Sequence, residues 1–329
     1  MPPAPDPATR TTGPDLEDRI AADPHRFRVL TGDRPTGPLH LGHYFGTLAN
    51  RVRLQDLGVE TYLVVADYQV ITDREVAGDV PGHVRELLLD RLAAGIDPAR
   101  TTIFTHSAVP ALNQLLLPLL SLISVAELGR NPTVKAETAA SGRAMSGLML
   151  TYPVHQAADI LFCSADLVPV GQDQLAHLEV TRTLARRFND RYGPHRPVFT
   201  VPQPLVGAAP TLLGIDGRKM SKSRGNAIEL RAGADETAAL IRRARTDGDR
   251  RITYDPATRP EVANLLELAG LCLDRHPAAL ADEIGGGGAA ELKALVTDAV
   301  NDHFAPLRRR RAELAADAAT GGLDEILAR

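Results

Sequence analysis

The chain has 329 residues, which is enough for one large α/β domain and a smaller second one. Hydrophobic residues make up 44% of the sequence, which is enough for a sizeable core. The formal net charge is −4, so any RNA contact must use local basic patches. Two distant cysteines with no CxxC pair argue against a zinc site or a disulfide framework, and indicate a reducing compartment. Without an apolar run long enough to span a membrane, and without a signal-peptide core in MPPAPDPATRTTGP, we expect a cytoplasmic protein.

The first informative stretch lies near the N-terminus. Residues 1–23 are rich in proline and polar side chains, and they predict a disordered tail. The chain then predicts a strand in RFRVLTG, a Gly/Pro loop and a helix that begins in LGHYFGTLANRVRLQ. In an open α/β sheet such a loop lies where ligands bind, and a helix N-terminus offers N–H groups to phosphates. His40 and His43, three residues apart, can both reach one phosphate, although a Gly/Pro turn with two solvated histidines would give the same pattern.

The next part of the chain alternates strands and helices. Thr61–Ala66 predicts a buried parallel strand that runs into a loop at Asp67, and TTIFTHS predicts another strand. Helices are expected over about Pro81–Gly95 and Pro110–Leu128. Asn131–Gly147 has few large apolar residues and is expected to be a mobile connection. The alternation predicts an α/β fold with a doubly wound parallel sheet.

A third stretch, residues 152–189, reads YPVHQAADILFCSADLVPVGQDQLAHLEVTRTLARRFN. It predicts a helix after Pro153, a short strand in DLVPV, a strand-end loop in GQDQ that suits a ribose, and a second helix. On the first helix Tyr152, Gln156 and Asp159 lie near one stripe, at spacings of four and three. Asp159 is either a pocket group among small apolar residues or an ordinary carboxylate on a helix surface.

Residues 219–223 read KMSKS between glycines, which alone would predict a basic and flexible surface loop. A fixed five-residue string is expected about once in three million start positions for equiprobable residues, so chance explains it poorly. HLGH followed downstream by KMSKS resembles the paired motifs of class I aminoacyl-tRNA synthetases. The blocks YPVxQAADIL and VPVGxDQxxHLExTRxxARRFN are similar to tryptophanyl-tRNA synthetases, and this resemblance runs from about Phe27 to the C-terminus.

The resemblance implies a domain organisation and an activity. It implies a Rossmann-like catalytic domain over residues 24–228 and a smaller, all-helical anticodon-binding domain over residues 229–329. It also implies ATP-dependent activation of L-tryptophan to tryptophanyl-adenylate, transfer of the acyl group to tRNA(Trp), Mg²⁺ as companion of ATP, and a homodimer. No protein-bound metal is expected.

The resemblance also implies roles for residues at matching positions. Asp159 would accept the indole N–H, which is a donor only, so that phenylalanine would leave a buried acceptor unpaired. The other implied tryptophan contacts are Gln69, Tyr152, Gln156 and Gln174. The implied catalytic residues are His40, His43, Lys219 and Lys222, with the lysines acting as point charges on the leaving pyrophosphate. The implied ATP-binding residues are Arg34, Pro35, Thr36, Gly42, His43, Gly171, Gln172, Asp173, Lys219, Met220, Ser221, Lys222 and Ser223.

Two positions depart from the family's pattern. The first loop usually reads GxQPT or GxQPS but here reads GDRPT, which puts Arg34 at the glutamine. A later loop usually reads DxHAIT but here reads DYQVIT, which puts Gln69 at the histidine. Both departures resemble the divergent second bacterial form of the enzyme, and they bear on inhibitor sensitivity and amino-acid contacts more than on the reaction.

Three other functions share part of the pattern. Tyrosyl-tRNA synthetases carry the same two motifs, but their pocket must satisfy a phenolic hydroxyl, and AADIL argues against that. A nucleotidyltransferase that forms an adenylate without tRNA shares HxGH but does not need a C-terminal helical domain. A regulatory protein without aminoacylation is disfavoured by the intact HLGH and KMSKS. The arginine run 308–311 is either a tRNA contact or a solvated helix face.

Overall fold

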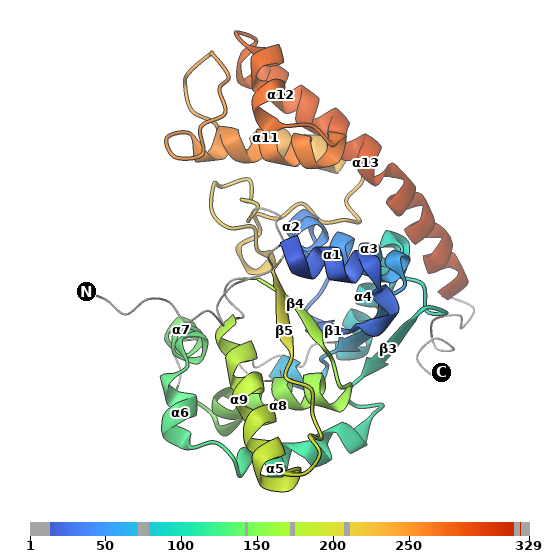
Figure 1. Cartoon of the computed structure of the whole chain (residues 1–329). Helices are drawn as coiled ribbons and strands as arrows, with labels where there is room; N and C mark the ends of the chain where they lie inside the picture. Colours follow the sequence, from blue (N-terminus) through green and yellow to red (C-terminus); the bar gives the residue numbers. More distant parts are fainter. Residues whose placement is uncertain are drawn as a thin grey trace.

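A parallel β-sheet forms the centre of the larger part of the molecule (Figure 1). The computed structural model describes residues 14–71, 79–141, 144–171, 175–206, 211–318 and 323. Within them the sheet has the order β3-β2-β1-β4-β5, and every neighbouring pair is parallel. The strands are β1 (Arg28–Asp33), β2 (Glu60–Val65), β3 (Thr101–Thr105), β4 (Leu167–Val170) and β5 (Gln203–Val206). The order reverses direction between β1 and β4, which is the switch point where α/β sheets bind ligands. The predicted α/β fold is confirmed.

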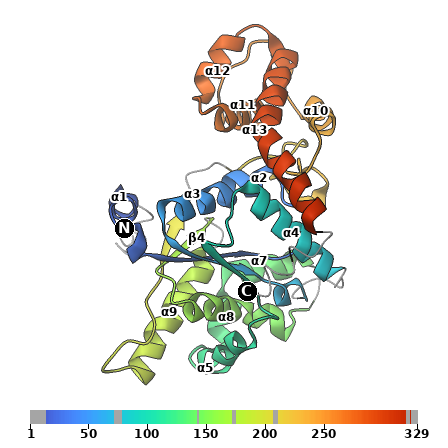
Figure 2. The same ribbon diagram turned by 90° about the vertical axis from the view of Figure 1, so that its right-hand side faces the viewer.

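Helices cover both faces of the sheet, and Figure 2 shows α2, α3 and α4 on one face and α5, α8 and α9 on the other. The helices of this part are α1 (Pro14–Ala22), α2 (Leu41–His43), α3 (Ala49–Leu57), α4 (Val80–Ala94), α5 (Leu116–Leu120), α6 (Val125–Arg130), α7 (Pro132–Ser141), α8 (Gly147–Phe162) and α9 (Leu175–Tyr192). Short helical turns are η2 (Pro24–Arg26), η3 (Tyr44–Leu48), η4 (Tyr68–Ile71), η5 (Pro110–Leu115) and η7 (Lys222–Arg224). Leucines and small residues of α8, α9 and the η5–α6 region form one core cluster, so these helices close the second face.

The expected disordered tail is wrong for residues 14–22, which form α1. Leu16 and Ile20 are buried against Phe27 and Leu54, so apolar packing orders a segment that its overall composition marks as polar. Residues 1–13 lie outside the described part of the chain.

The expected mobile connection over residues 131–147 is also wrong in part, because residues 132–141 form α7. The Asn131 side chain accepts the backbone N–H of Thr133 at 3.0 Å and so caps that helix, and Val134 anchors it in the interior. Helix α8 begins at Gly147, well before the predicted start, because the Ser146 hydroxyl caps it. Pro153 then lies inside this helix.

The helix expected over Pro110–Leu128 is divided into η5, α5 and α6. Pro118 lies inside the short α5, and a new helix start follows at Ser124. The hydroxyl of Ser124 accepts the N–H of Glu127 at 3.2 Å, while the Glu127 carboxylate accepts the N–H of Ser124 at 3.0 Å. This capping box marks a true helix N-terminus inside a sequence that reads as continuous.

A helical part follows the sheet and lies above α2 and α4 in Figure 2. Its helices are α10 (Ala234–Arg243), α11 (Pro260–Leu273), α12 (Pro277–Ile284) and α13 (Gly288–Ala318). One core cluster includes Leu63 and Leu87 together with Leu266 and Phe304, so the two parts share apolar packing. The domain boundary at residue 228 therefore stays a prediction. Among the described residues, no helix is long and apolar enough to cross a membrane.

Candidate functional site

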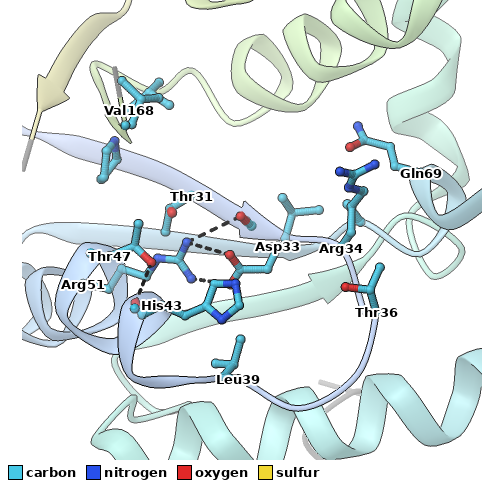
Figure 3. Close-up of a pocket in the computed structure, with 18 of the residues that line it drawn as sticks. Thr31, Asp33, Arg34, Thr36, Leu39, His43, Thr47, Arg51, Gln69 and Val168 are labelled. Atoms are coloured by element: carbon cyan, nitrogen blue, oxygen red, sulfur yellow. Dashed lines mark hydrogen bonds and ion pairs between the residues drawn. The ribbon is translucent and has the colours of Figure 1, made fainter. Parts of the chain in front are cut away.

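A cavity of about 760 Å³ opens at the switch point between β1 and β4, a size typical of small-molecule sites (Figure 3). It brings together the end of β1, the HLGH segment, one side of α8 and the KMSKS segment. The predicted site residues that line it are Arg34, Thr36, His40, Gly42, His43, Gln69, Tyr152, Gln156, Asp159, Gly171, Lys219, Met220, Ser221 and Lys222. Pro35 is buried and does not line the cavity. Gln172, Asp173, Gln174 and the side chain of Ser223 lie outside the described part.

The HLGH segment packs its two histidines against each other, with ring centroids 3.6 Å apart. The backbone N–H of His40 donates to Nδ1 of His43 at 3.2 Å. A side chain at Gly42 would lie 3.1 Å from the His40 ring, so glycine gives that ring its space. Burial is the main cause that lowers the pKa of His40 to about 3 and that of His43 to about 4. Both rings are neutral at pH 7 and can offer N–H donors to an anion.

The KMSKS segment closes over the loop that follows β1. The Nζ of Lys222 donates to the carbonyl of Gly37 at 2.7 Å, and Met220 is buried. The side chain of Asn226, which is also buried, accepts the N–H of Ser221 at 2.8 Å and so fixes the turn from inside. The segment thus holds the ammonium group of Lys222 next to the histidine pair.

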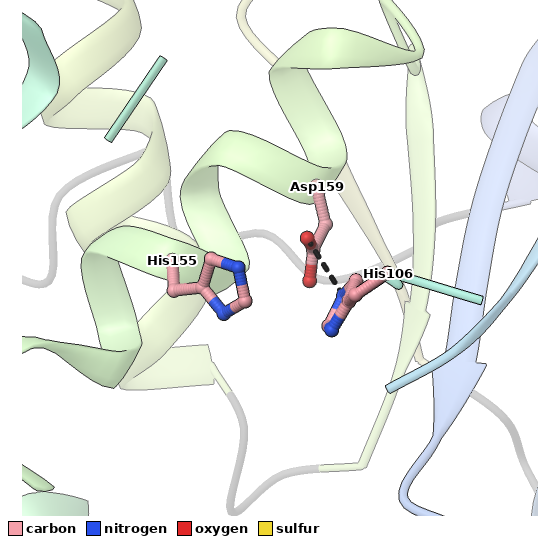
Figure 4. A group of neighbouring side chains, drawn as sticks. All are labelled: His106, His155 and Asp159. Carbon is pink, nitrogen blue, oxygen red and sulfur yellow. Dashed lines mark ion pairs between the residues drawn. The ribbon is translucent and has the colours of Figure 1, made fainter. Parts of the chain in front are cut away.

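Asp159 lines another part of the cavity and belongs to a buried cluster with His106 and His155 (Figure 4). Only 3% of Asp159 is exposed, and its Oδ1 lies 3.0 Å from Nε2 of His106. The two atoms are not aligned for a hydrogen bond, so this oxygen accepts none from the described residues. His155 is held by a 3.0 Å bond from its Nε2 to Asn113. The result is a buried acceptor without an aligned donor among the described residues, which is a costly arrangement unless a ligand supplies one.

The same three side chains have the type and spacing of metal ligands, since one donor atom from each lies within 4.8 Å of the others. The sequence predicts no protein-bound metal. Asp159 also lines the cavity, so the cluster adjoins it.

A histidine that the sequence analysis did not single out fixes the two other predicted contacts on α8. Nε2 of His177 lies 2.9 Å from the hydroxyl of Tyr152, and its Nδ1 lies 3.2 Å from Oε1 of Gln156. His177 is buried in α9, one helix away. Arg34 and Gln69, the two departures from the family's pattern, also line the cavity and lie side by side (Figure 3). The bonds to His177 fix the orientation of the Tyr152 and Gln156 side chains at the cavity wall.

Asp33 and Arg51 form the floor of the cavity beside His43, and Asp33 is also bound by the buried Arg91, which does not line the cavity. Asp33, at the end of β1, binds Arg51 at 3.0 Å and Arg91 at 2.7 Å. Burial alone would raise the pKa of Asp33, but the charges and hydrogen bonds of the two arginines hold it well below its usual value. With two cations and one anion the group carries a net positive charge, which favours an anionic ligand above it. Sequence reasoning missed these residues, although the position of Asp33 at a strand end was a usable signal.

Comparison with known proteins gives consistent relatives. The family model for tRNA synthetases class I (W and Y) matches residues 23–305. The tryptophan–tRNA ligase of Treponema pallidum (strain Nichols) is 41% identical over 310 residues, covering 88% of this chain and 87% of that protein. The ligase of Lactococcus lactis is 39% identical over 300 residues, covering 87% of each. The crystal structure of tryptophanyl-tRNA synthetase from Campylobacter jejuni, complexed with ADP and tryptophan, aligns with a TM-score of 0.77 at 30% identity, covering 91% of this chain and 92% of that one.

Proposed function

The chain belongs to the class I tRNA synthetases for tryptophan and tyrosine and is a tryptophan–tRNA ligase, and on that premise we propose how its cavity divides between two substrates. The end at Asp159 takes the indole of L-tryptophan, and the end at HLGH and KMSKS takes ATP. A carboxylate oxygen of tryptophan attacks the α-phosphorus, the bond to the β-phosphate oxygen breaks, and pyrophosphate leaves. The resulting tryptophanyl-adenylate then passes its acyl group to the terminal ribose of tRNA(Trp).

The unpaired acceptor on Asp159 is the observation that carries this proposal. Its Oδ1 is buried and accepts no hydrogen bond from the described residues. The indole N–H is a donor with no acceptor capacity, so it supplies what the carboxylate lacks. His106 lies against the same oxygen and limits how the carboxylate can turn. Tyr152 and Gln156, held by His177, then hold the backbone and the ring of the amino acid.

At the other end, electrostatic stabilisation without a protein nucleophile accounts for the chemistry. His40 and His43 donate neutral N–H groups to phosphate oxygens, which fits the lowered pKa of both rings. Lys219 and Lys222 place positive charge on the departing pyrophosphate. Lys222 exchanges the carbonyl of Gly37 for a phosphate oxygen when the loop closes over ATP.

Several backbone and side-chain groups are left for the rest of the nucleotide. We assign its adenine, ribose and α-phosphate to the lining residues Arg34, Thr36, Gly42, Gly171, Met220 and Ser221. The net positive floor below His43 supports the phosphate end of this assignment, because it lies under the histidine pair.

Mg²⁺ enters as the companion of ATP. Of the described residues that line the cavity, the carboxylates are Asp33 and Asp159. Asp33 is bound to two arginines, and Asp159 lies at the amino-acid end, so the described residues at the phosphate end offer no free carboxylate to a hard cation. The fitting arrangement is therefore an ion held by phosphate oxygens and water, where it neutralises phosphate charge.

The proposal includes the partners of the enzyme. Helices α10–α13 bind the anticodon of tRNA(Trp), and the enzyme works as a cytoplasmic homodimer, as the family resemblance implies. The arginine run 308–311 offers fewer charges to tRNA than its length suggests. Arg309 and Arg310 are exposed, whereas Arg308 bonds to Thr237 and Asn301 inside the protein. Arg311 is bound to α4.

The test of the site assignment is tryptophan-dependent ATP–pyrophosphate exchange by Asp159→Ala. We expect kcat/KM for tryptophan to fall by at least about a hundredfold, equivalent to about 3 kcal/mol, because an oriented contact to the indole is lost. Asp190→Ala, an exposed aspartate on α9, is the matched control and should behave as the wild type. Unchanged kcat/KM in Asp159→Ala would contradict the assignment.

A further inference from the structure

A buried carboxylate on α4 lies where three segments that are distant in sequence meet. Asp90 has no exposed surface. Its Oδ2 accepts the backbone N–H of Leu39 at 2.8 Å, one residue before His40. Its Oδ1 accepts Nε of Arg311, on α13 of the helical part, at 2.7 Å. Figure 2 shows α13 descending from the helical part onto α4. One side chain thus joins the last helix to the residue that leads into HLGH.

Further contacts hold both sides of this junction. The carbonyl of Leu39 accepts the N–H of Leu230, which follows KMSKS in the chain, at 2.9 Å. Glu86, one turn before Asp90, binds Arg311 and also binds Arg231 at 3.2 Å. Leu39 is therefore fixed through its N–H by α4 and through its carbonyl by the segment after KMSKS. A shift of α13 would act on both.

Stability alone does not explain a carboxylate at this position. The neighbouring side chains Leu87, Leu88 and Leu92 are buried in the apolar core. Burial is the main cause that raises the pKa of Asp90, and the bonds from Arg311 and Leu39 oppose it. Replacing a buried ion pair by apolar residues is often neutral or stabilising. What an apolar residue cannot do is bind one backbone N–H beside the histidine pair and one guanidinium of a remote helix at the same time.

We propose that Asp90 is a positioning residue that couples the docking of α13, through Arg311, to the placement of the HLGH segment, through the N–H of Leu39. The rate of adenylate formation then depends on a residue in the helical part, far from the reacting atoms. This inference rests on the proposed role of His40 in binding ATP phosphates.

The test compares Arg311→Met and Arg311→Lys with Glu313→Met, which changes an exposed charge two residues along the same helix. Exchange is measured at saturating ATP over a range of tryptophan concentrations, below the unfolding temperature of each variant, so that it gives kcat and KM. We expect Arg311→Met to lower kcat by about ten- to a hundredfold, because small misplacements of catalytic groups have effects of this size. KM for tryptophan should stay unchanged, since Asp159 lies at the other end of the cavity. Arg311→Lys should fold and show an intermediate loss, and Glu313→Met should match the wild type.

A double-mutant cycle separates coupling from simple packing. The loss in Asp90→Asn/Arg311→Met should be much smaller than the product of the two single losses, because both act through one contact. Multiplicative losses, or a lower melting temperature with unchanged kcat in both Arg311 variants, would overturn the proposal. His40→Ala distinguishes failure of the proposed function from failure of the proposed coupling. If it leaves exchange intact, the proposed function of the site fails, whereas loss of exchange in His40→Ala with full activity in Arg311→Met refutes the coupling alone.

Discussion

The charged floor of the cavity leads us to expect unequal losses of stability when its anion, or one of the cations bound to that anion, is removed. Among the described residues, Asp33 is the anion that pairs with both Arg51 and Arg91, whose side chains are 3% and 0% exposed. In Asp33→Asn the two guanidinium groups lose their shared counter-charge while they stay buried. Leaving buried charge uncompensated costs about 3–5 kcal/mol. In Arg91→Met one cation is removed, the Arg51–Asp33 pair remains neutral as a unit, and the new side chain fills most of the space. The expected change in the free energy of unfolding is then within about 1 kcal/mol of zero.

Urea unfolding at pH 7, followed by far-UV circular dichroism, measures both variants. With an m-value of about 3 kcal/mol per molar, Asp33→Asn should lower the midpoint by about 1 M or more, and Arg91→Met should leave it within about 0.3 M of the wild type. Equal losses in the two variants would refute the reasoning, because packing and not charge balance would then govern this site. A loss confined to Arg91→Met would refute it as well.

Three further predictions concern the site. Lys222→Ala should slow tryptophan-dependent exchange by about a hundredfold or more at unchanged tryptophan affinity, because the lysine acts on phosphate charge; weaker tryptophan binding at an unchanged rate would contradict this. His106→Ala should weaken tryptophan binding about tenfold or more, and His106→Gln should weaken it less, because glutamine still fills part of the space beside Asp159 and limits how its carboxylate can turn. The chain has no tryptophan, so fluorescence of the bound amino acid reports this affinity directly, and equal losses in the two variants would speak against the role. The free energy of unfolding should decrease as the pH falls from 6.5 towards 4. In this range His40 and His43 bind protons in the unfolded chain but stay neutral in the folded protein, where their pKa values are about 3 and about 4. His40→Gln should flatten the pH dependence of the urea midpoint, and an identical slope would contradict the assignment.

Local sequence patterns predicted the parts of the site that lie on single elements. The parallel strands, the loop after β1 and the stripe of Tyr152, Gln156 and Asp159 follow from periodicity and from the position of a strand end. That HLGH and KMSKS line one cavity followed from the family resemblance, because nothing local links segments about 180 residues apart.

The partners of the site residues could not be predicted in this way. His177 meets Tyr152 from another helix, and Arg91 meets Asp33 from α4, so only tertiary packing brings them together. The arginine run shows the same limit. Its sequence indicates a solvated or RNA-binding helix face, but in the structure Arg311 points towards Asp90 and Arg310 is exposed to solvent. Periodicity gives the spacing on a helix but not which neighbour each face meets.

The central claim is that the buried carboxylate of Asp159 selects tryptophan for adenylation. ATP–pyrophosphate exchange with the purified wild-type enzyme and each of the twenty amino acids tests it most directly. We predict exchange with L-tryptophan, and exchange with tyrosine or phenylalanine reduced by at least about a hundredfold in kcat/KM, because neither presents an indole N–H to this acceptor. Equal exchange with tyrosine and tryptophan, or no exchange with tryptophan, would contradict the account.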